Sequence, residues 1–293
     1  MFSLLLNKIG SHQAKTRLLC KYACIAFFGF LAFQLYVILI DALITNLTTR
    51  LLLSALSLLT GCLTGSFIWR LFYPVECNIC GWQGKKFLDA NLDYGLIKEN
   101  DICPSCESVS RHRFVFIYLQ KLFPKNKNLK ILHISPEISL QKFIQSHQKA
   151  DYLSIDLNPE AAMQAENLEN LSFPDKNFDL IICNHVLEHV TDDKRAIQEI
   201  FRVTKENGLA IISVPIDIHR QQTYENENIK SPEERIKHFW YQDHLRLYGL
   251  DFSQRLATTG FKVDTHFSLD EYKKRFIDRH GLGGKHVYLC YKK

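Results

Sequence analysis

The sequence predicts an α/β protein whose doubly wound, mostly parallel sheet follows a small zinc ribbon and two transmembrane helices. Three observations support this prediction. Two long uncharged runs lie near the N-terminus, four cysteines follow them as two C-x2-C pairs, and strand-like and helix-like segments alternate from Asn128 onward. Such alternation is typical of a parallel sheet that helices cover on both faces.

Charge is distributed unevenly along the 293 residues, whose formal net charge is +5. Residues 1–73 contain six Lys or Arg and one acid, Asp41, so residues 74–293 contain 30 basic and 30 acidic side chains. A large basic footprint for nucleic acid is therefore excluded from the second part, although a local patch is not.

Residues 22–40 and 51–69 are two uncharged runs of 19 residues, separated by ten. Each is long enough to cross the hydrocarbon layer as a helix, so residues 1–73 are predicted to form a membrane hairpin. Four basic residues precede the first run, which places the N-terminus and the C-terminal domain on the cytoplasmic side of a cell (inner) membrane. The alternatives are two buried core helices or a signal peptide, and no small-residue cleavage site follows the first run.

The cysteines Cys77, Cys80, Cys103 and Cys106 form two C-x2-C pairs with 22 residues between them. Four thiolates in this pattern complete a tetrahedral zinc site with no open position, so a bound Zn²⁺ is expected to be structural. Free thiols and two disulfides are the alternatives, and a cytoplasmic location disfavours disulfides. Residues 74–127 are expected to hold this ribbon and a linker helix.

The remaining residues, 128–293, predict a Rossmann-like domain. A helix is expected to open at Ser135-Pro136-Glu137, and another from about Asp193. Ligands of such sheets bind at the carboxyl ends of the strands, where Ser135, Asp156 and Asn184 fall. Strands are expected at residues 129–134, 152–156, 178–183, 209–214, 261–267 and 286–291.

Residues 173–190 and 196–208 resemble class I S-adenosylmethionine-dependent methyltransferases. The later run from Ser231 to Gly249 resembles a bacterial subgroup in which a four-cysteine ribbon and an Arg-His-Arg segment, here residues 111–113, precede the domain. The resemblance implies a methyltransferase that uses S-adenosyl-L-methionine as its cofactor.

The same resemblance implies roles for individual residues. Asp156 matches the position that binds the ribose hydroxyls, a role that a carboxylate after the second strand suits chemically. Asn167 and Leu168 match the adenine edge, and Asn184 and His185 match positions beside the methionine moiety. Ser135 and Glu137 lie in the first strand–helix turn, which contains no glycine although the family usually has a glycine-rich turn there.

His244 belongs to a polar and aromatic group with His219, Tyr224, Arg246 and Tyr248 in a region that usually covers the substrate. We interpret it as the first candidate for a general base, because an imidazole titrates near neutral pH. A structural histidine under a loop is the alternative.

Residues 185–189 also read H-x-x-E-H, a zinc-protease pattern. Because His185 directly follows an apolar strand, we interpret this run as a cofactor-pocket wall followed by the start of a helix.

The predicted function is a membrane-anchored methyltransferase that acts at the cytoplasmic face. Its expected partners are the lipid bilayer and a small-molecule or lipid-linked acceptor, such as a lipid-linked glycan or an envelope precursor. One alternative is a non-catalytic scaffold or binding protein that has lost its cofactor. Another is an RNA methyltransferase, which the charge balance of residues 74–293 disfavours.

Overall fold

The computed structural model describes residues 74–91, 97–123, 128–147 and 150–293, together with residues 29, 31 and 32. Apart from those three residues, the predicted membrane spans 22–40 and 51–69 lie outside the described part of the chain. Within that part, no helix has both the length and the apolar character that a membrane crossing requires.

The chain divides into two compact units. One contains residues 1–76 and 81–86, of which β1 (Val75–Glu76) and β2 (Gln83–Gly84) form an antiparallel pair. The other contains residues 77–80 and 87–293, including the sheet and all four predicted zinc ligands.

The central sheet of the second unit has seven strands in the order β12-β13-β9-β8-β5-β6-β7. Pairing is parallel from β9 to β7 and antiparallel at β12 and β13. The doubly wound, mostly parallel sheet is therefore confirmed. The strands are β5 (Leu129–Ile134), β6 (Ala150–Asp156), β7 (Gln164–Ala165), β8 (Phe178–Asn184), β9 (Thr204–Ser213), β12 (Lys262–Phe267) and β13 (His286–Tyr291).

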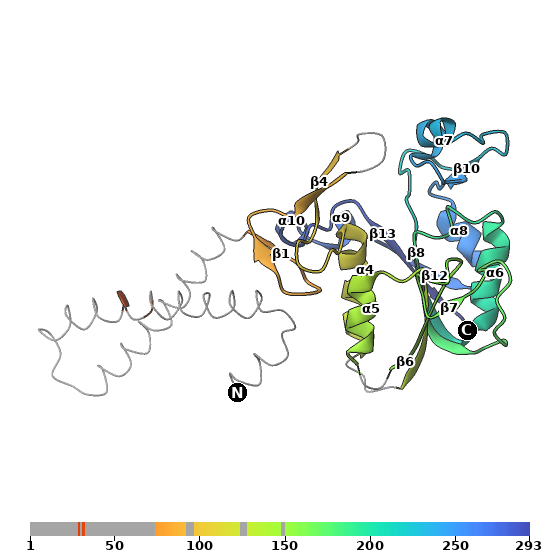
Figure 1. Cartoon of the computed structure of the whole chain (residues 1–293), viewed down its shortest axis with the longest axis horizontal. Helices are drawn as coiled ribbons and strands as arrows, with labels where there is room; N and C mark the ends of the chain where they lie inside the picture. Colours follow the sequence, from red (N-terminus) through yellow and green to blue (C-terminus); the bar gives the residue numbers. More distant parts are fainter. Residues whose placement is uncertain (1–28, 30, 33–73, 92–96, 124–127, 148–149) are drawn as a thin grey trace, which may run out of the picture. The chain divides into compact units, whose positions relative to one another are not determined.

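Helices cover both faces of this sheet (Figure 1). On one face, α4 (Ser110–Leu122) and α5 (Ile138–Gln145) pack on a core that includes Leu180 and Ile182 of β8. On the other, α6 (Asp193–Val203) and α8 (Phe252–Ala257) pack on Ile181 and Cys183. Alternate residues of β8 thus face opposite cores, which explains its continuous apolar sequence.

The smaller elements surround this three-layer arrangement. β3 (Leu88–Asn91) pairs with β4 (Ile97–Ile102), and β10 (Tyr224–Glu225) pairs with β11 (Arg246–Leu247). The remaining helices are α7 (Pro232–Phe239), α9 (Ser268–Glu271) and α10 (Lys274–His280).

Several predicted boundaries were wrong, and β6, for example, begins at Ala150 rather than Tyr152. The helix after β5 begins at Ile138, with Glu137 rather than Ser135 at its N-cap, because the Ser135 N–H still bonds the Ile155 carbonyl (2.8 Å). Strand β9 begins at Thr204 rather than Leu209, since Thr204 already pairs with Phe178 before a shift in register. The helix predicted from about Asp193 begins there, and the Asp192 side chain caps it by accepting the Arg195 N–H (3.0 Å).

Candidate functional site

A cavity of about 410 Å³ lies at the carboxyl ends of β5 and β6 and at the turn after β8. Because the chain winds in opposite directions from the β5–β8 neighbour pair, this is the topological switch point where doubly wound sheets bind ligands. The predicted residues Ser135, Asp156, Asn167, Leu168 and His185 all line it. Its other lining residues are Ile134, Ile155, Leu157, Glu166, Glu169, Val186, His189, Val190, Thr191 and Asp243.

Asp156 ends β6 at the wall of this cavity. Its Oδ1 accepts the backbone N–H of Asn158 (2.9 Å), and its carbonyl accepts the N–H of Glu166 (3.0 Å). These bonds fix the carboxylate at the cavity wall. A carboxylate oxygen has room for more than one hydrogen bond, so Asp156 can also receive hydroxyl donors from a ligand.

Ser135 shows how a turn without glycine reaches the cavity. Its φ is +50°, in the left-handed region that normally favours glycine. Serine tolerates this conformation at a cost of about 1–2 kcal/mol, and the hydrogen bond to Ile155 holds it. The chain therefore turns sharply after β5, as the glycine-rich version of the motif would.

Asn167 and Leu168 lie in a tight turn beside the cavity. The Asn167 Oδ1 accepts the N–H of Glu169 (2.9 Å), and its carbonyl accepts the N–H of Asn170 (2.9 Å). The side-chain oxygen thus stabilises the turn itself, which fixes the backbone of both residues at the cavity wall.

Two of the predicted cofactor residues, Asn184 and Glu137, do not line the cavity. Asn184 is buried at the end of β8, where its Oδ1 accepts the Ser213 hydroxyl (3.0 Å) and its Nδ2 has no hydrogen-bond partner among the described residues. Their predicted cofactor contacts remain predictions.

Glu137 is bonded inward, against the base of α5. His133 donates from Nε2 to its Oε2 (2.8 Å), and its Oε1 lies 3.6 Å from Nε2 of the buried His112. Burial opposes ionisation of Glu137, but the bond from His133 and the nearby imidazoles lower its pKa to about 2. The carboxylate is thus charged, and its Oε2 has its hydrogen bond from His133 within the protein.

His185 lies at the surface of the cavity, whereas His244 is buried behind it. His185 has a φ of +54°, lines the cavity and lies 3.0 Å (Nδ1) from Oε1 of Glu188. His244 is buried, does not line the cavity, and donates from Nδ1 to the Phe239 carbonyl (2.9 Å). Its ring lies 4.8 Å from that of His189, which lines the cavity. The general-base role predicted for His244 is not tested by this arrangement.

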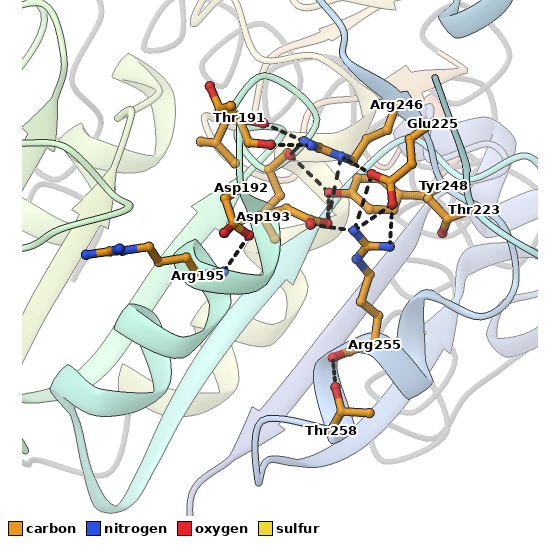
Figure 2. A network of polar contacts seen from close by, with 12 residues as sticks. Thr191, Asp192, Asp193, Arg195, Thr223, Glu225, Arg246, Tyr248, Arg255 and Thr258 are labelled. Carbon is orange, nitrogen blue, oxygen red and sulfur yellow. Dashed lines mark hydrogen bonds and ion pairs between the residues drawn. The ribbon is translucent and has the colours of Figure 1, made fainter. Parts of the chain in front are cut away.

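A buried polar network supports the cavity wall formed by residues 186–191 (Figure 2). Arg246 donates to the carbonyls of Leu187 (2.8 Å), Val190 (2.6 Å) and Thr191 (2.8 Å). The Tyr248 hydroxyl lies 2.8 Å from Asp193, which Arg255 also binds. Arg246 and Tyr248 thus hold this wall through their functional groups, and the covering of a substrate by their region remains a prediction.

The wall residues Glu166, Glu169 and Asp243 were not predicted from the sequence, whereas His189 belongs to the run 185–189 that was interpreted as a cofactor-pocket wall followed by the start of a helix. Their types carry no signal by themselves, because surface loops are rich in the same side chains. The signal that was available for Glu166, Glu169 and His189 is their position in the segments that follow β7 and β8, at the edge where the parallel strands end. Asp243 lies between α7 and β11 and carried no such signal.

The four cysteines are brought together as predicted. Cys77 and Cys106 have their sulfurs 3.6 Å apart, as do Cys80 and Cys103, and none of them forms a disulfide. Tetrahedral zinc with Zn–S bonds of about 2.3 Å separates its sulfurs by about 3.8 Å. The Ser108 hydroxyl lies 3.3 Å from Cys77 and 3.2 Å from Cys106. The donor set and its spacing fit a structural zinc ion.

Comparisons with known proteins agree with this geometry. Residues 120–212 match a family model described as a methyltransferase domain, which spans α4 to β9 and includes the strands β5, β6 and β8. The matched stretch therefore contains every residue that lines the cavity except Asp243.

The relatives extend this match. Over 45 residues the chain is 40% identical to an uncharacterized methyltransferase, YcgJ, of Bacillus subtilis, covering 15% of this chain and 18% of that protein. It is 30% identical over 120 residues to the uncharacterized protein MJ1123 of Methanocaldococcus jannaschii, covering 38% of this chain and 55% of that one. The chain thus spans less than two thirds of these curated relatives.

Among solved structures, an S-adenosylmethionine-dependent methyltransferase from Archaeoglobus fulgidus is similar, with 14% identity and a TM-score of 0.44 over 64% of this chain and 96% of that one. Residues 120–212 thus match a methyltransferase domain, and they lie within the doubly wound sheet that holds the cavity at its switch point.

Proposed function

We propose that the protein transfers the methyl group of S-adenosylmethionine, and that the cofactor binds in the cavity at the ends of β5 and β6. The observation that carries this proposal is the placement of Asp156 on the cavity wall, beside the turn of Asn167 and Leu168. A ribose bound by Asp156 would extend its base toward that turn. Its methionine end would extend toward Ser135 and His185.

The contribution of the protein to such a reaction is mainly positioning. The cofactor supplies the activated methyl group, and the pocket has to hold it in line with an acceptor atom. The wall at residues 186–191, which Arg246 fixes from behind, is the part of the cavity that would orient the acceptor.

The acceptor follows from the predicted location. We infer anchoring in the cell (inner) membrane from the two apolar runs at residues 22–40 and 51–69 and from the basic residues before the first of them. An enzyme tethered at the cytoplasmic face meets membrane-bound acceptors at a high local concentration. A lipid-linked glycan or an envelope precursor is therefore the proposed acceptor class.

The four cysteines complete the proposal as a structural zinc site. Arg113 connects this site to the C-terminal part of the domain: it is fully buried, donates to the Ser108 carbonyl (2.6 Å), and donates to the carbonyls of His280 (2.7 Å) and Gly281 (3.0 Å). The zinc would fix the segment around Ser108, whose carbonyl binds Arg113. We assign no catalytic role to the metal.

Calorimetric titration of the full-length protein in detergent with S-adenosylmethionine tests the cofactor assignment. Replacing Asp156 by Ala should weaken binding about 10- to 100-fold, since hydrogen bonds to a charged group contribute about 1.5–3 kcal/mol. Asp151→Ala is the matched control, because Asp151 is exposed on the same strand. It lies opposite Lys130 in the register of β5 and β6, away from the cavity.

Three outcomes would contradict the proposal in different ways. Unchanged affinity in Asp156→Ala would remove this residue from the site. No binding heat with the unmodified protein would favour a scaffold without cofactor. Salt-dependent retention of RNA by the same preparation would favour an RNA acceptor over a lipid-linked one.

A further inference from the structure

A second cluster of potential metal ligands lies outside the four cysteines. Glu188, His189 and His244 each offer a ligand atom, and these atoms all lie within 4.8 Å of one another. Glu188 and His189 belong to the turn after β8, whereas His244 comes from the segment before β11. The fold therefore brings together residues more than fifty positions apart.

Glu188 is the first reason to regard this cluster as a site. Its side chain is fully buried, and its Oε2 has no hydrogen-bond partner within the described chain. His185 Nδ1 approaches Oε1 at 3.0 Å, which leaves Oε2 without a counterpart. A buried carboxylate oxygen without a partner lowers the stability of the fold unless a nearby cation compensates its charge.

The orientation of the two imidazoles is the second reason. His244 donates from Nδ1 to the Phe239 carbonyl (2.9 Å), and Nδ1 of His189 faces Oδ2 of Asp243 at 3.3 Å. With Nδ1 protonated in each ring, Nε2 keeps its lone pair. Metal-binding histidines typically have their second nitrogen fixed by a carbonyl or a carboxylate in this way.

We propose that Glu188, His189 and His244 bind a divalent transition metal such as Zn²⁺. Two imidazoles and one carboxylate are a ligand set that zinc and similar ions accept, and they leave a further coordination position open. Ligand atoms about 2.1 Å from a metal lie at most about 4.2 Å apart. The half-exposed His189 ring can make the small rotation that this spacing requires.

The site joins two segments of the cavity wall. His189 and Asp243 both line the cavity, and the N–H of Leu245 bonds the carbonyl of Glu188 (2.8 Å). A bound metal would lock the segment around His244 onto the turn after β8. This inference does not depend on methyl transfer. If a metal occupies this site, Nε2 of His244 holds it and is not free to act as the predicted general base.

Metal content of the full-length protein, measured by mass spectrometry after equilibration with zinc and dialysis, tests the proposal. The unmodified protein should retain about two zinc ions per chain, one at the cysteines and one here, and His189→Ala should retain about one. His189 is part-exposed, so this variant should fold. His219→Ala is the matched control, because His219 is exposed and distant from the cluster in the sequence.

Affinity for zinc gives a graded second measurement. Asp243→Asn keeps all three ligands but weakens the contact between residue 243 and Nδ1 of His189 that orients this ring. It should therefore reduce zinc affinity by about 10- to 100-fold. Equal zinc content in the unmodified protein and in His189→Ala would overturn the proposal. Displacement of the zinc by an equal concentration of Mg²⁺ would overturn the assignment to a transition metal, because Mg²⁺ prefers oxygen ligands.

Discussion

Ser135 shows how one residue replaces a motif. The family's usual turn has glycine, which adopts a positive φ without strain, whereas here a serine adopts a φ of +50° and lines the cavity. The glycine-free sequence therefore preserves the geometry of the turn. What changes is the presence of a side chain next to the proposed cofactor.

Substitutions at Ser135 should reveal this strain. Ser135→Gly is expected to leave the free energy of unfolding unchanged or higher by up to about 1 kcal/mol, because it relieves the left-handed conformation. Ser135→Val is expected to lower it by about 1–3 kcal/mol, since a β-branched side chain resists that conformation. Urea unfolding measures both, and equal destabilisation by the two variants would contradict the argument.

His112 predicts a dependence of stability on pH. Burial lowers its pKa from 6.5 to about 4, despite the charge of Glu137. Between these values the unfolded chain takes up a proton that the folded protein does not, so the free energy of unfolding should fall as the pH drops through this window. The contribution is at most about 3 kcal/mol.

Unfolding by urea across that pH window, with His112→Gln as the comparison, measures this contribution. The part-buried His185 and the buried His244 also have lowered pKa values for the same first reason, burial, and titrate in both proteins. The difference between the two curves therefore isolates His112. Parallel curves would contradict the prediction.

At the scale of elements, the turn between β8 and α6 is held from outside itself. Arg246, the first residue of β11, donates to three carbonyls of this turn, and Tyr248 and Arg255 bind Asp193 at the start of α6 (Figure 2). The cavity wall is thus positioned by residues that follow it by more than fifty positions in the sequence.

Arg246→Met should therefore destabilise the fold by about 3 kcal/mol or more, because it strands buried carbonyls and weakens the pairing of Asp193. It should also weaken binding of S-adenosylmethionine. Arg275→Met, on the exposed surface of α10, is the control and should have little effect. Urea unfolding and calorimetry measure the two effects, and an unchanged unfolding midpoint for Arg246→Met would sink the prediction.

The cysteine cluster is the second element whose integrity can be tested. Cys106→Ser should release the structural zinc and lower the unfolding temperature, because a structural metal contributes its binding energy to folding. Cys290→Ala is the control, since Cys290 is buried on β13 and lies outside the cluster. Zinc content and calorimetric melting measure the outcome. Equal zinc content in the two variants would exclude these cysteines as ligands.

For the whole molecule, the two apolar runs predict membrane attachment. After alkaline carbonate extraction of cell membranes, the protein should remain in the pellet, because apolar spans resist a treatment that removes peripheral proteins. Protease added to intact cells from outside should leave the domain uncut, whereas opening the cells should expose it. Release of the protein into the carbonate supernatant would contradict anchoring.

Much of the fold was predictable from the sequence, and the reason is burial. Strands covered on both faces read as apolar runs, so β5, β8 and β13 appear within one residue of their predicted bounds. Asp156 was predictable because its position depends only on where a strand ends. Loop conformation was not: neither the positive φ of Ser135 nor the meeting of Glu188 with His244 follows from any periodicity.

The position of β13 has a consequence for how the domain is made. This strand follows β12 in the chain, yet it lies between β9 and β12 in the sheet. During translation, β12 therefore emerges before β13, its pairing partner in the described sheet, and it must wait until residues 286–291 have left the ribosome. Until then the Leu209–Ile212 side of β9 is an open edge, so the nascent domain is most prone to mispairing at this stage.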